Sequence, residues 1–170
     1  MSENEQVHPF RSLEKAIRTD APQVYGGSGI YQPEEVQAEL IRRFTRSMYS
    51  MSITSAFHWP EVLDLSAHRI MLDIGGSSGA HSIGAVSRWP DLRAIIFDFP
   101  MVCQIAQDFI AQHGMQDRIA TCGGDMWSDP LPAADLHFYS TVYNDWAFDK
   151  CSFLTAKSFN SLPSGGRIII

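Results

Sequence analysis

The chain has 170 residues, of which 45% are hydrophobic and 19% charged, and its formal net charge is −6. This length allows one domain with a real core and is too short for two full domains. A mildly acidic chain without a run of lysine or arginine has no electrostatic reason to bind a nucleic-acid backbone. No apolar stretch reaches the roughly 18 residues of a membrane-spanning helix. Three widely spaced cysteines without a CxxC pair predict free thiols in a reducing cytoplasm and no metal site.

The first part of the chain is predicted to form a loop followed by a helix. Residues 19–32 are rich in glycine, proline, serine and tyrosine and are interpreted as an ordered loop. Pro33 and two glutamates suit a helix start, and apolar side chains then recur at helical spacing, which predicts a helix over residues 33–56. We therefore expect residues 1–60 to form a loop and a short helical segment, and residues 61–170 to form the main domain.

After residue 69, short apolar runs alternate with amphipathic segments. The predicted strands cover residues 70–74, 94–97, 118–121, 135–140 and 167–170, and the predicted helices cover residues 80–88, 101–113 and 149–162. Strands that alternate with helices predict an α/β fold with a mainly parallel sheet and helices on both faces. The strands are apolar without alternation, which agrees with burial on both faces. Because the chain stops inside a predicted core strand, we expect the last strands of the domain to be missing.

A glycine-rich turn follows the first predicted strand and reads DIGGSSG over residues 73–79. Glycine lets the backbone adopt positive φ and approach a ligand closely. The helix that follows presents free N–H groups and a positive dipole end to an anion. In open parallel sheets, ligands bind beyond the carboxyl ends of the strands. The turn therefore predicts a ligand site, with a tight turn that binds nothing as the alternative.

The spacing of the glycines separates two classes of ligand. A dinucleotide site has the pattern GxGxxG, which fails here because its third and sixth positions are Ser77 and Ala80. The pattern of S-adenosylmethionine sites is an acidic residue with glycines at the second, fourth and sixth positions after it. Asp73, Gly75 and Gly79 match this pattern, and Ser77 is a small residue at the remaining position. The loop therefore favours S-adenosylmethionine.

Two further carboxylates follow the next two predicted strands. Asp98 ends the second strand, where its two oxygens are able to accept hydrogen bonds from both hydroxyls of a ribose. The alternative is that Asp98 caps the next helix. Asp125 follows the third strand and is placed to accept from an adenine amino group, and Met126 and Trp127 offer an apolar, polarizable surface for a purine. Core packing with a turn is the alternative for this segment.

Five blocks of the sequence carry a family resemblance; they read LDIGGSSGAHS, IIFDFP, DRIATCGGDMWSDPLP, DLHFYSTVYNDW and LPSGGRIII. In order and spacing, residues 69–170 resemble the catalytic domain of the plant-type, or family 2, O-methyltransferases. That family includes caffeic acid and acetylserotonin O-methyltransferases and bacterial tailoring enzymes of secondary metabolism. The resemblance implies a Rossmann-like class I methyltransferase fold. It also implies methyl transfer from S-adenosylmethionine to a hydroxyl of a small aromatic acceptor, with S-adenosylhomocysteine as product, and allows a homodimer.

The resemblance also implies roles for individual residues. The block FTRSMYSMS, residues 44–52, is similar to the helix with which family members close the pocket. By that resemblance, Met48 lines the substrate region and Ser52 contacts the carboxylate end of the cofactor; core packing of Phe44 and Met48 is the alternative. The cofactor-binding residues implied or argued above are Ser52, Asp73, Gly75, Gly76, Gly79, Asp98, Phe99, Gly124, Asp125, Met126, Ser140 and Trp146.

The sequence departs from the family at the catalytic position. The family has His-Asp-Trp after the fourth strand, with the histidine as general base, and this chain has Asn144, Asp145 and Trp146. An amide has no useful basicity near neutral pH, so Asn144 cannot remove a proton. Asp145 is a candidate base, but an ordinary aspartate with a pKa of about 3.9 is weak against a phenol. Ser140 is a second departure, because plant members often have lysine there.

Three functions therefore stay open on the sequence alone. They are an O-methyltransferase, a cofactor-binding homologue without methyl transfer, and an inactive fragment.

Two histidines receive structural interpretations. His81, directly after the loop, is interpreted as a polar residue at a helix start, with approach to the cofactor as the alternative. His137 is interpreted as a partly buried histidine with satisfied hydrogen bonds.

Overall fold

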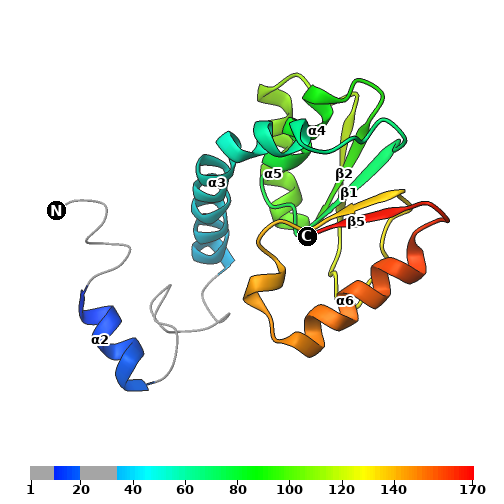
Figure 1. The fold of residues 1–170 in the computed structure, drawn as a ribbon. Helices are drawn as coiled ribbons and strands as arrows, with labels where there is room; N and C mark the ends of the chain where they lie inside the picture. The colour runs from blue at the N-terminus through cyan, green and yellow to red at the C-terminus, as the bar shows by residue number, and fades with distance from the viewer. Residues whose placement is uncertain (1–9, 20–33) are drawn as a thin grey trace. The chain divides into compact units, whose positions relative to one another are not determined.

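The computed structural model describes residues 10–19 and 34–170 (Figure 1). The chain separates into two compact units, Met1–Ile41 and Arg42–Ile170. The predicted loop over residues 19–32 lies, apart from Thr19, outside the described residues. The predicted boundary near residue 60 stays a prediction.

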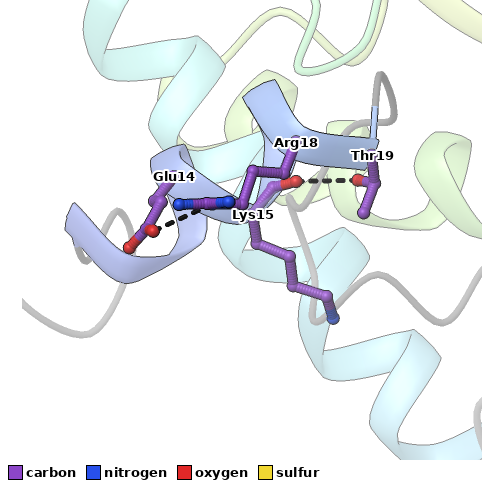
Figure 2. Close-up of polar contacts among 4 residues, drawn as sticks. All are labelled: Glu14, Lys15, Arg18 and Thr19. Carbon is purple, nitrogen blue, oxygen red and sulfur yellow. Dashed lines mark hydrogen bonds and ion pairs between the residues drawn. The ribbon is translucent and has the colours of Figure 1, made fainter.

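In the first unit, helix α2 spans Phe10–Thr19. Figure 2 shows its local polar contacts. Arg18 Nε donates to Glu14 Oε1 at 3.0 Å, and Thr19 Oγ1 donates to the carbonyl oxygen of Lys15 at 2.8 Å. An exposed ion pair four residues apart contributes only about 0.3–0.5 kcal/mol. This helix was not predicted from the sequence.

The second unit contains a five-stranded parallel sheet in the order β3-β2-β1-β4-β5. The strands are β1 (Ile70–Ile74), β2 (Arg93–Asp98), β3 (Ile119–Gly123), β4 (Leu136–Phe138) and β5 (Arg167–Ile169). The predicted α/β class and parallel sheet are confirmed. The fourth strand is shorter than the predicted 135–140. The Tyr139 N–H still donates to the Ile169 carbonyl oxygen of β5 at 2.9 Å, and Thr141 then adopts a positive φ of 57°.

The helices of this unit are the later part of α3 (Glu34–His58), α4 (Ala80–Arg88), α5 (Pro100–Gln112) and α6 (Phe148–Ser161), with short 3₁₀ turns η2 (Trp59–Glu61) and η3 (Tyr143–Asp145). Figure 1 shows α5 and α6 on opposite sides of the sheet. This follows from topology, because the strand order advances in one direction through β1, β2 and β3 and in the other through β4 and β5. Right-handed crossovers then place the connecting helices on opposite faces.

The core lies on both faces of the central strand. Met71, Leu72 and Ile74 of β1 are completely buried, as the unbroken apolar run predicts. The α3 and α4 helices pack closely where Gly84 faces the backbone of Ala56. A Cβ at Gly84 would lie 1.9 Å from the Ala56 carbonyl oxygen, so this contact requires glycine.

Candidate functional site

The strand order reverses between β1 and β4, which are neighbours in the sheet but lead to strands on opposite sides. In open parallel sheets such a switch point opens a crevice beyond the carboxyl ends of the strands. Here a hollow lies at that edge of the sheet. The residues that line this hollow are Met48, Ser52, Asp73, Gly75, Gly76, Ser77, Ser78, Ala80, His81, Ser140 and Thr141. The segments that leave β1 and β4 therefore form its wall together with α3.

The loop after β1 has a conformation that requires glycine at two positions. Gly75 and Gly79 have φ values of 70° and 76°. A Cβ at Gly79 would also lie 2.2 Å from Ile96 Cδ1. Ser77 adopts the same left-handed region, with φ 50°, which costs about 1–2 kcal/mol for a residue with a Cβ. The backbone of the loop is thereby brought to the surface of the hollow.

Asp98, at the end of β2, holds this loop in place. The Ser77 N–H donates to Asp98 Oδ2 at 2.9 Å, and the Phe99 N–H donates to Asp98 Oδ1 at 2.8 Å. Burial raises the pKa of Asp98, and these two hydrogen bonds oppose that rise. The N-cap of α5 is Phe99, so Asp98 does not cap the helix. Each carboxylate oxygen retains a lone pair, which is what recognition of two ribose hydroxyls needs.

Asp73 is buried beneath the loop. Its Oδ2 accepts a hydrogen bond from Ser82 Oγ at 2.7 Å, which links β1 to α4. Burial raises the pKa of Asp73 to about 7, with a smaller contribution from the charge of Asp98. Gly76 packs directly on this carboxyl group, because a Cβ there would lie 2.7 Å from Asp73 Cγ. Asp73 therefore supports the loop from below.

The segment after β3 lies beside Asp98. The Gly124 N–H donates to the Asp98 carbonyl oxygen at 2.9 Å, and a Cβ at Gly124 would lie 2.5 Å from the Phe97 ring. Asp125 closes a local turn, because its Oδ1 accepts from the Trp127 N–H at 2.9 Å. The backbone segments that carry Asp98 and Asp125 are thus neighbours at the carboxyl ends of β2 and β3.

Two predicted residues on α3 reach the hollow. Met48 and Ser52 both line it. The helix is fixed between them by Tyr49, whose ring stacks on Phe109 of α5 with centroids 4.1 Å apart and whose hydroxyl lies 2.6 Å from His113 Nε2. Phe44, which was the partner of Met48 in the core-packing alternative, is 50% exposed.

Two histidines have surroundings that the sequence did not show. His81 lines the hollow, and its Nε2 lies 3.0 Å from Ser140 Oγ. The predicted place of His81 at a helix start is confirmed, because it is the second residue of α4, and its approach to the cofactor stays a prediction. His137 is completely buried rather than partly buried. Its Nδ1 is 3.0 Å from Ser158 Oγ, but its Nε2 has no hydrogen-bond partner among the described residues.

The predicted catalytic positions lie in the 3₁₀ turn η3. Asn144 and Asp145 are both exposed, and neither lines the hollow. Trp146 is 43% exposed and meets Trp127 edge-on, with ring centroids 4.8 Å apart. The predicted cofactor residues outside the wall of the hollow are Gly79, Asp98, Phe99, Gly124, Asp125, Met126 and Trp146.

Within residues 10–19 and 34–170, no group of histidine, cysteine or acidic side chains is arranged to hold a metal ion. No helix in that part of the chain is long and apolar enough to cross a membrane.

The parallel sheet, the glycine loop at its switch point and the carboxylates at the next two strand ends define a domain of the Rossmann-like class I methyltransferase type. The chain belongs to the O-methyltransferase domain family, whose model matches residues 10–170.

The relatives of the chain include acetylserotonin O-methyltransferase of Bos taurus, which is 33% identical over 95% of this chain and 48% of that protein. The 3-hydroxy-5-methyl-1-naphthoate 3-O-methyltransferase of Streptomyces sahachiroi is 32% identical over 92% of this chain and 45% of that protein. The crystal structure of human N-acetylserotonin methyltransferase in complex with SAM has a TM-score of 0.78, with 26% identity over 94% of this chain and 47% of that one. The chain thus spans about half the length of the relatives it matches.

Proposed function

We propose that this chain binds S-adenosylmethionine and carries the donor site of an O-methyltransferase that acts on a hydroxyl of a small aromatic molecule. The observation that carries the proposal is the hollow at the switch point, bounded by the glycine loop and continued by Asp98 and Asp125 at the next two strand ends. The relatives support the donor and the acceptor class, since one was solved with SAM and another is named for a hydroxynaphthoate.

The residues present fit such a cofactor. Ser77 Oγ is buried without a hydrogen-bond partner among the described residues, although Ser77 lines the hollow. A polar atom in that position is satisfied when a ligand supplies the partner. Gly75 and Gly76 keep the loop backbone at the wall of the hollow, because added Cβ atoms would lie 3.0 Å from Val142 Cγ2 and 2.7 Å from Asp73 Cγ. The site therefore favours a polar ligand that lies against backbone.

We propose that each part of the site contacts a different part of the cofactor or acceptor. The loop from Gly75 to Gly79 and the first turn of α4 hold the amino-acid part of the cofactor, because free N–H groups and the positive helix end favour a carboxylate. Asp98 accepts from the ribose hydroxyls, and Asp125 accepts from the adenine amino group. Met48 lines the substrate region, and Ser52 contacts the carboxylate end of the cofactor.

The cofactor would supply a methyl group on a sulfonium, and the neutral thioether that is left when the methyl group moves is a good leaving group. The contribution of the protein is then to hold donor and acceptor in line, which by itself lowers the barrier substantially. Asn144 cannot take the proton of the acceptor hydroxyl. We therefore propose that the chain acts best on acceptors that are already ionised, so that turnover increases as pH approaches the pKa of the acceptor.

A second candidate function is cofactor binding without methyl transfer. The observation that favours it is Asn144, which is an exposed amide at the position of the family's catalytic histidine. Transfer of labelled methyl from S-adenosylmethionine to a panel of phenols and naphthols, run beside calorimetry with S-adenosylhomocysteine, separates the two. Product formation supports the first function. Tight binding with no product from any acceptor supports the second, and failure to bind contradicts both.

We also propose that the protein acts in the cytoplasm as a homodimer on a small-molecule acceptor, without a nucleic-acid partner. The cysteines Cys103, Cys122 and Cys151 are free thiols, which agrees with a reducing compartment. Phe148 and Phe159 of α6 are 87% and 76% exposed, an apolar surface that an interface would cover. Light scattering after gel filtration tests the dimer, and a mass of 19.0 kDa for the species in solution would contradict it.

A further inference from the structure

His81 and Ser140 meet at the wall of the hollow although they come from different elements. His81 lies in the first turn of α4, and Ser140 lies just after β4. Ser140 Oγ and His81 Nε2 are 3.0 Å apart, and both residues line the hollow. The imidazole ring also packs at a tilt on Phe138, with centroids 5.3 Å apart. The ring is therefore held by packing while one nitrogen contacts the serine.

The surroundings of the other nitrogen indicate which tautomer is present. His81 Nδ1 is buried and has no hydrogen-bond partner among the described residues. A proton on Nδ1 would make it an unpaired buried donor, and such donors are rarer in proteins than under-satisfied acceptors. A proton on Nε2 is instead donated to Ser140 Oγ. Burial lowers the pKa of His81, which keeps the ring in a neutral form with a single N–H.

This tautomer determines what Ser140 offers to a ligand. A hydroxyl oxygen that accepts from Nε2–H keeps its own proton, and that proton is free to point into the hollow. In the other tautomer the proton is on Nδ1, and the serine hydroxyl would donate its own proton to Nε2. Among the described residues that line the hollow there is no lysine or arginine. An anionic group at the N-terminus of α4 must therefore be held by N–H and O–H donors.

We propose that His81 is a positioning residue that orients the Ser140 hydroxyl as a hydrogen-bond donor to the carboxylate at the amino-acid end of the cofactor. This inference rests on the proposed function. It explains how the carboxylate is recognised although no lysine or arginine is among the described residues that line the hollow. Carboxylate binding and the Nε2–H tautomer favour each other, because only that tautomer leaves the serine proton available.

The test measures the affinity of four variants for S-adenosylhomocysteine and for its decarboxylated analogue, S-adenosyl-3-thiopropylamine, by calorimetry. Ser140→Ala is expected to weaken S-adenosylhomocysteine binding about tenfold, the size of one hydrogen bond to a charged group. His81→Leu should weaken it severalfold, because the hydroxyl loses its orientation. Neither variant should change the affinity for the decarboxylated analogue.

Two further variants test the coupling. The double variant His81→Leu/Ser140→Ala should bind no more weakly than Ser140→Ala alone, because the histidine acts through the serine. His81→Gln should recover part of the affinity, since its amide is able to donate to Ser140. In the unaltered chain, ¹⁵N chemical shifts of the imidazole ring should report the Nε2–H tautomer at neutral pH.

Several results would overturn the inference. One is an equal loss of affinity for both ligands in His81→Leu, which would mean that the ring only packs. Additive losses in the double variant, or the Nδ1–H tautomer in the unaltered chain, would show that His81 does not orient Ser140. If the unaltered chain fails to bind S-adenosylhomocysteine, the proposed function fails as well, and that result is distinct because no substitution is involved.

Discussion

The backbone N–H of Ser77 donates to Asp98 Oδ2 over 2.9 Å, which ties the glycine loop after β1 to the end of β2. The same carboxylate accepts from the Phe99 N–H at 2.8 Å. One side chain therefore fixes the shape of the loop, and it is also the side chain that we propose accepts from the ribose hydroxyls of the cofactor.

Replacement of Asp98 with alanine should affect both stability and binding. Two backbone donors lose their acceptor, which lowers the free energy of unfolding by about 1–3 kcal/mol. Affinity for S-adenosylhomocysteine should fall at least tenfold, as expected when a ligand loses a charge-assisted hydrogen bond. Urea unfolding and calorimetry measure the two effects. Asp91→Ala, at an exposed aspartate before the same strand, is the matched control and should change neither. Unchanged affinity in Asp98→Ala would contradict the ribose assignment.

Two glycines with similar backbone angles should respond differently to alanine. Gly79 has φ 76° and a Cβ there would lie 2.2 Å from Ile96 Cδ1, whereas Gly114 has φ 66° and no atom within 4 Å of such a Cβ. Gly114→Ala should cost only the backbone strain, about 1–2 kcal/mol. Gly79→Ala should cost about 1–3 kcal/mol more, because a side chain of the core must move. Thermal unfolding of both variants measures the difference, and equal losses would mean that Ile96 adjusts freely.

Much of the fold was predictable because its signals are local. The apolar runs of β1 and β2, the turn residues around Gly79, and Gly114 with its positive φ at the end of α5 all depend on neighbouring residues. The contact between His81 and Ser140 was not predictable in this way. These residues are 59 positions apart and meet only because β1 and β4 are adjacent in the sheet.

The buried pair of His137 and Ser158 belongs to the same class of unpredicted contact. It forms between β4 and α6, and the burial that makes the histidine unusual comes from the packing of that helix on the sheet. The sequence shows a polar residue in a strand without showing that its surroundings exclude water. Helix α2 was not predicted for a different reason, because its apolar residues repeat over only 10 positions.

Substitution of Asn144 with histidine should restore a general base. The position is exposed, so the free energy of unfolding should change by less than about 0.5 kcal/mol. With a phenol that is protonated at neutral pH, the methyl transfer rate should increase at least tenfold. Its pH profile should gain an inflection near 6.5, the ordinary pKa of histidine. Asn144→Gln keeps an amide and is the control. A rate in Asn144→His no higher than in this control would mean that η3 does not face the acceptor.

Two buried groups should shift stability with pH in opposite directions. Burial lowers the pKa of His137 from 6.5 to about 4, so the unfolded chain binds more protons there and stability falls as pH decreases from 6.5 to 4. Burial raises the pKa of Asp73 from 3.8 to about 7, so the folded chain binds more protons and stability falls as pH increases from 3.8 to 7. Each contributes at most about 1.4 kcal/mol per pH unit.

Single variants should expose each of these contributions. Relative to the unaltered chain, Asp73→Asn should gain stability as pH increases between 4.5 and 6.5, and His137→Asn should lose it over the same range. The measurement is urea unfolding at several pH values, and the differences between chains remove the titration of all other groups. Parallel curves for a variant and the unaltered chain would contradict the shift assigned to the substituted group.

We propose that S-adenosylmethionine binds in the hollow beside Asp73–Gly79, with its nucleoside at Asp98 and Asp125. The most direct measurement is calorimetric titration of the full chain with S-adenosylhomocysteine, repeated in the presence of excess NAD⁺. We expect binding at one site per chain, weakened in Asp98→Ala and unaffected by the dinucleotide. No heat of binding, or displacement of the ligand by NAD⁺, would contradict it.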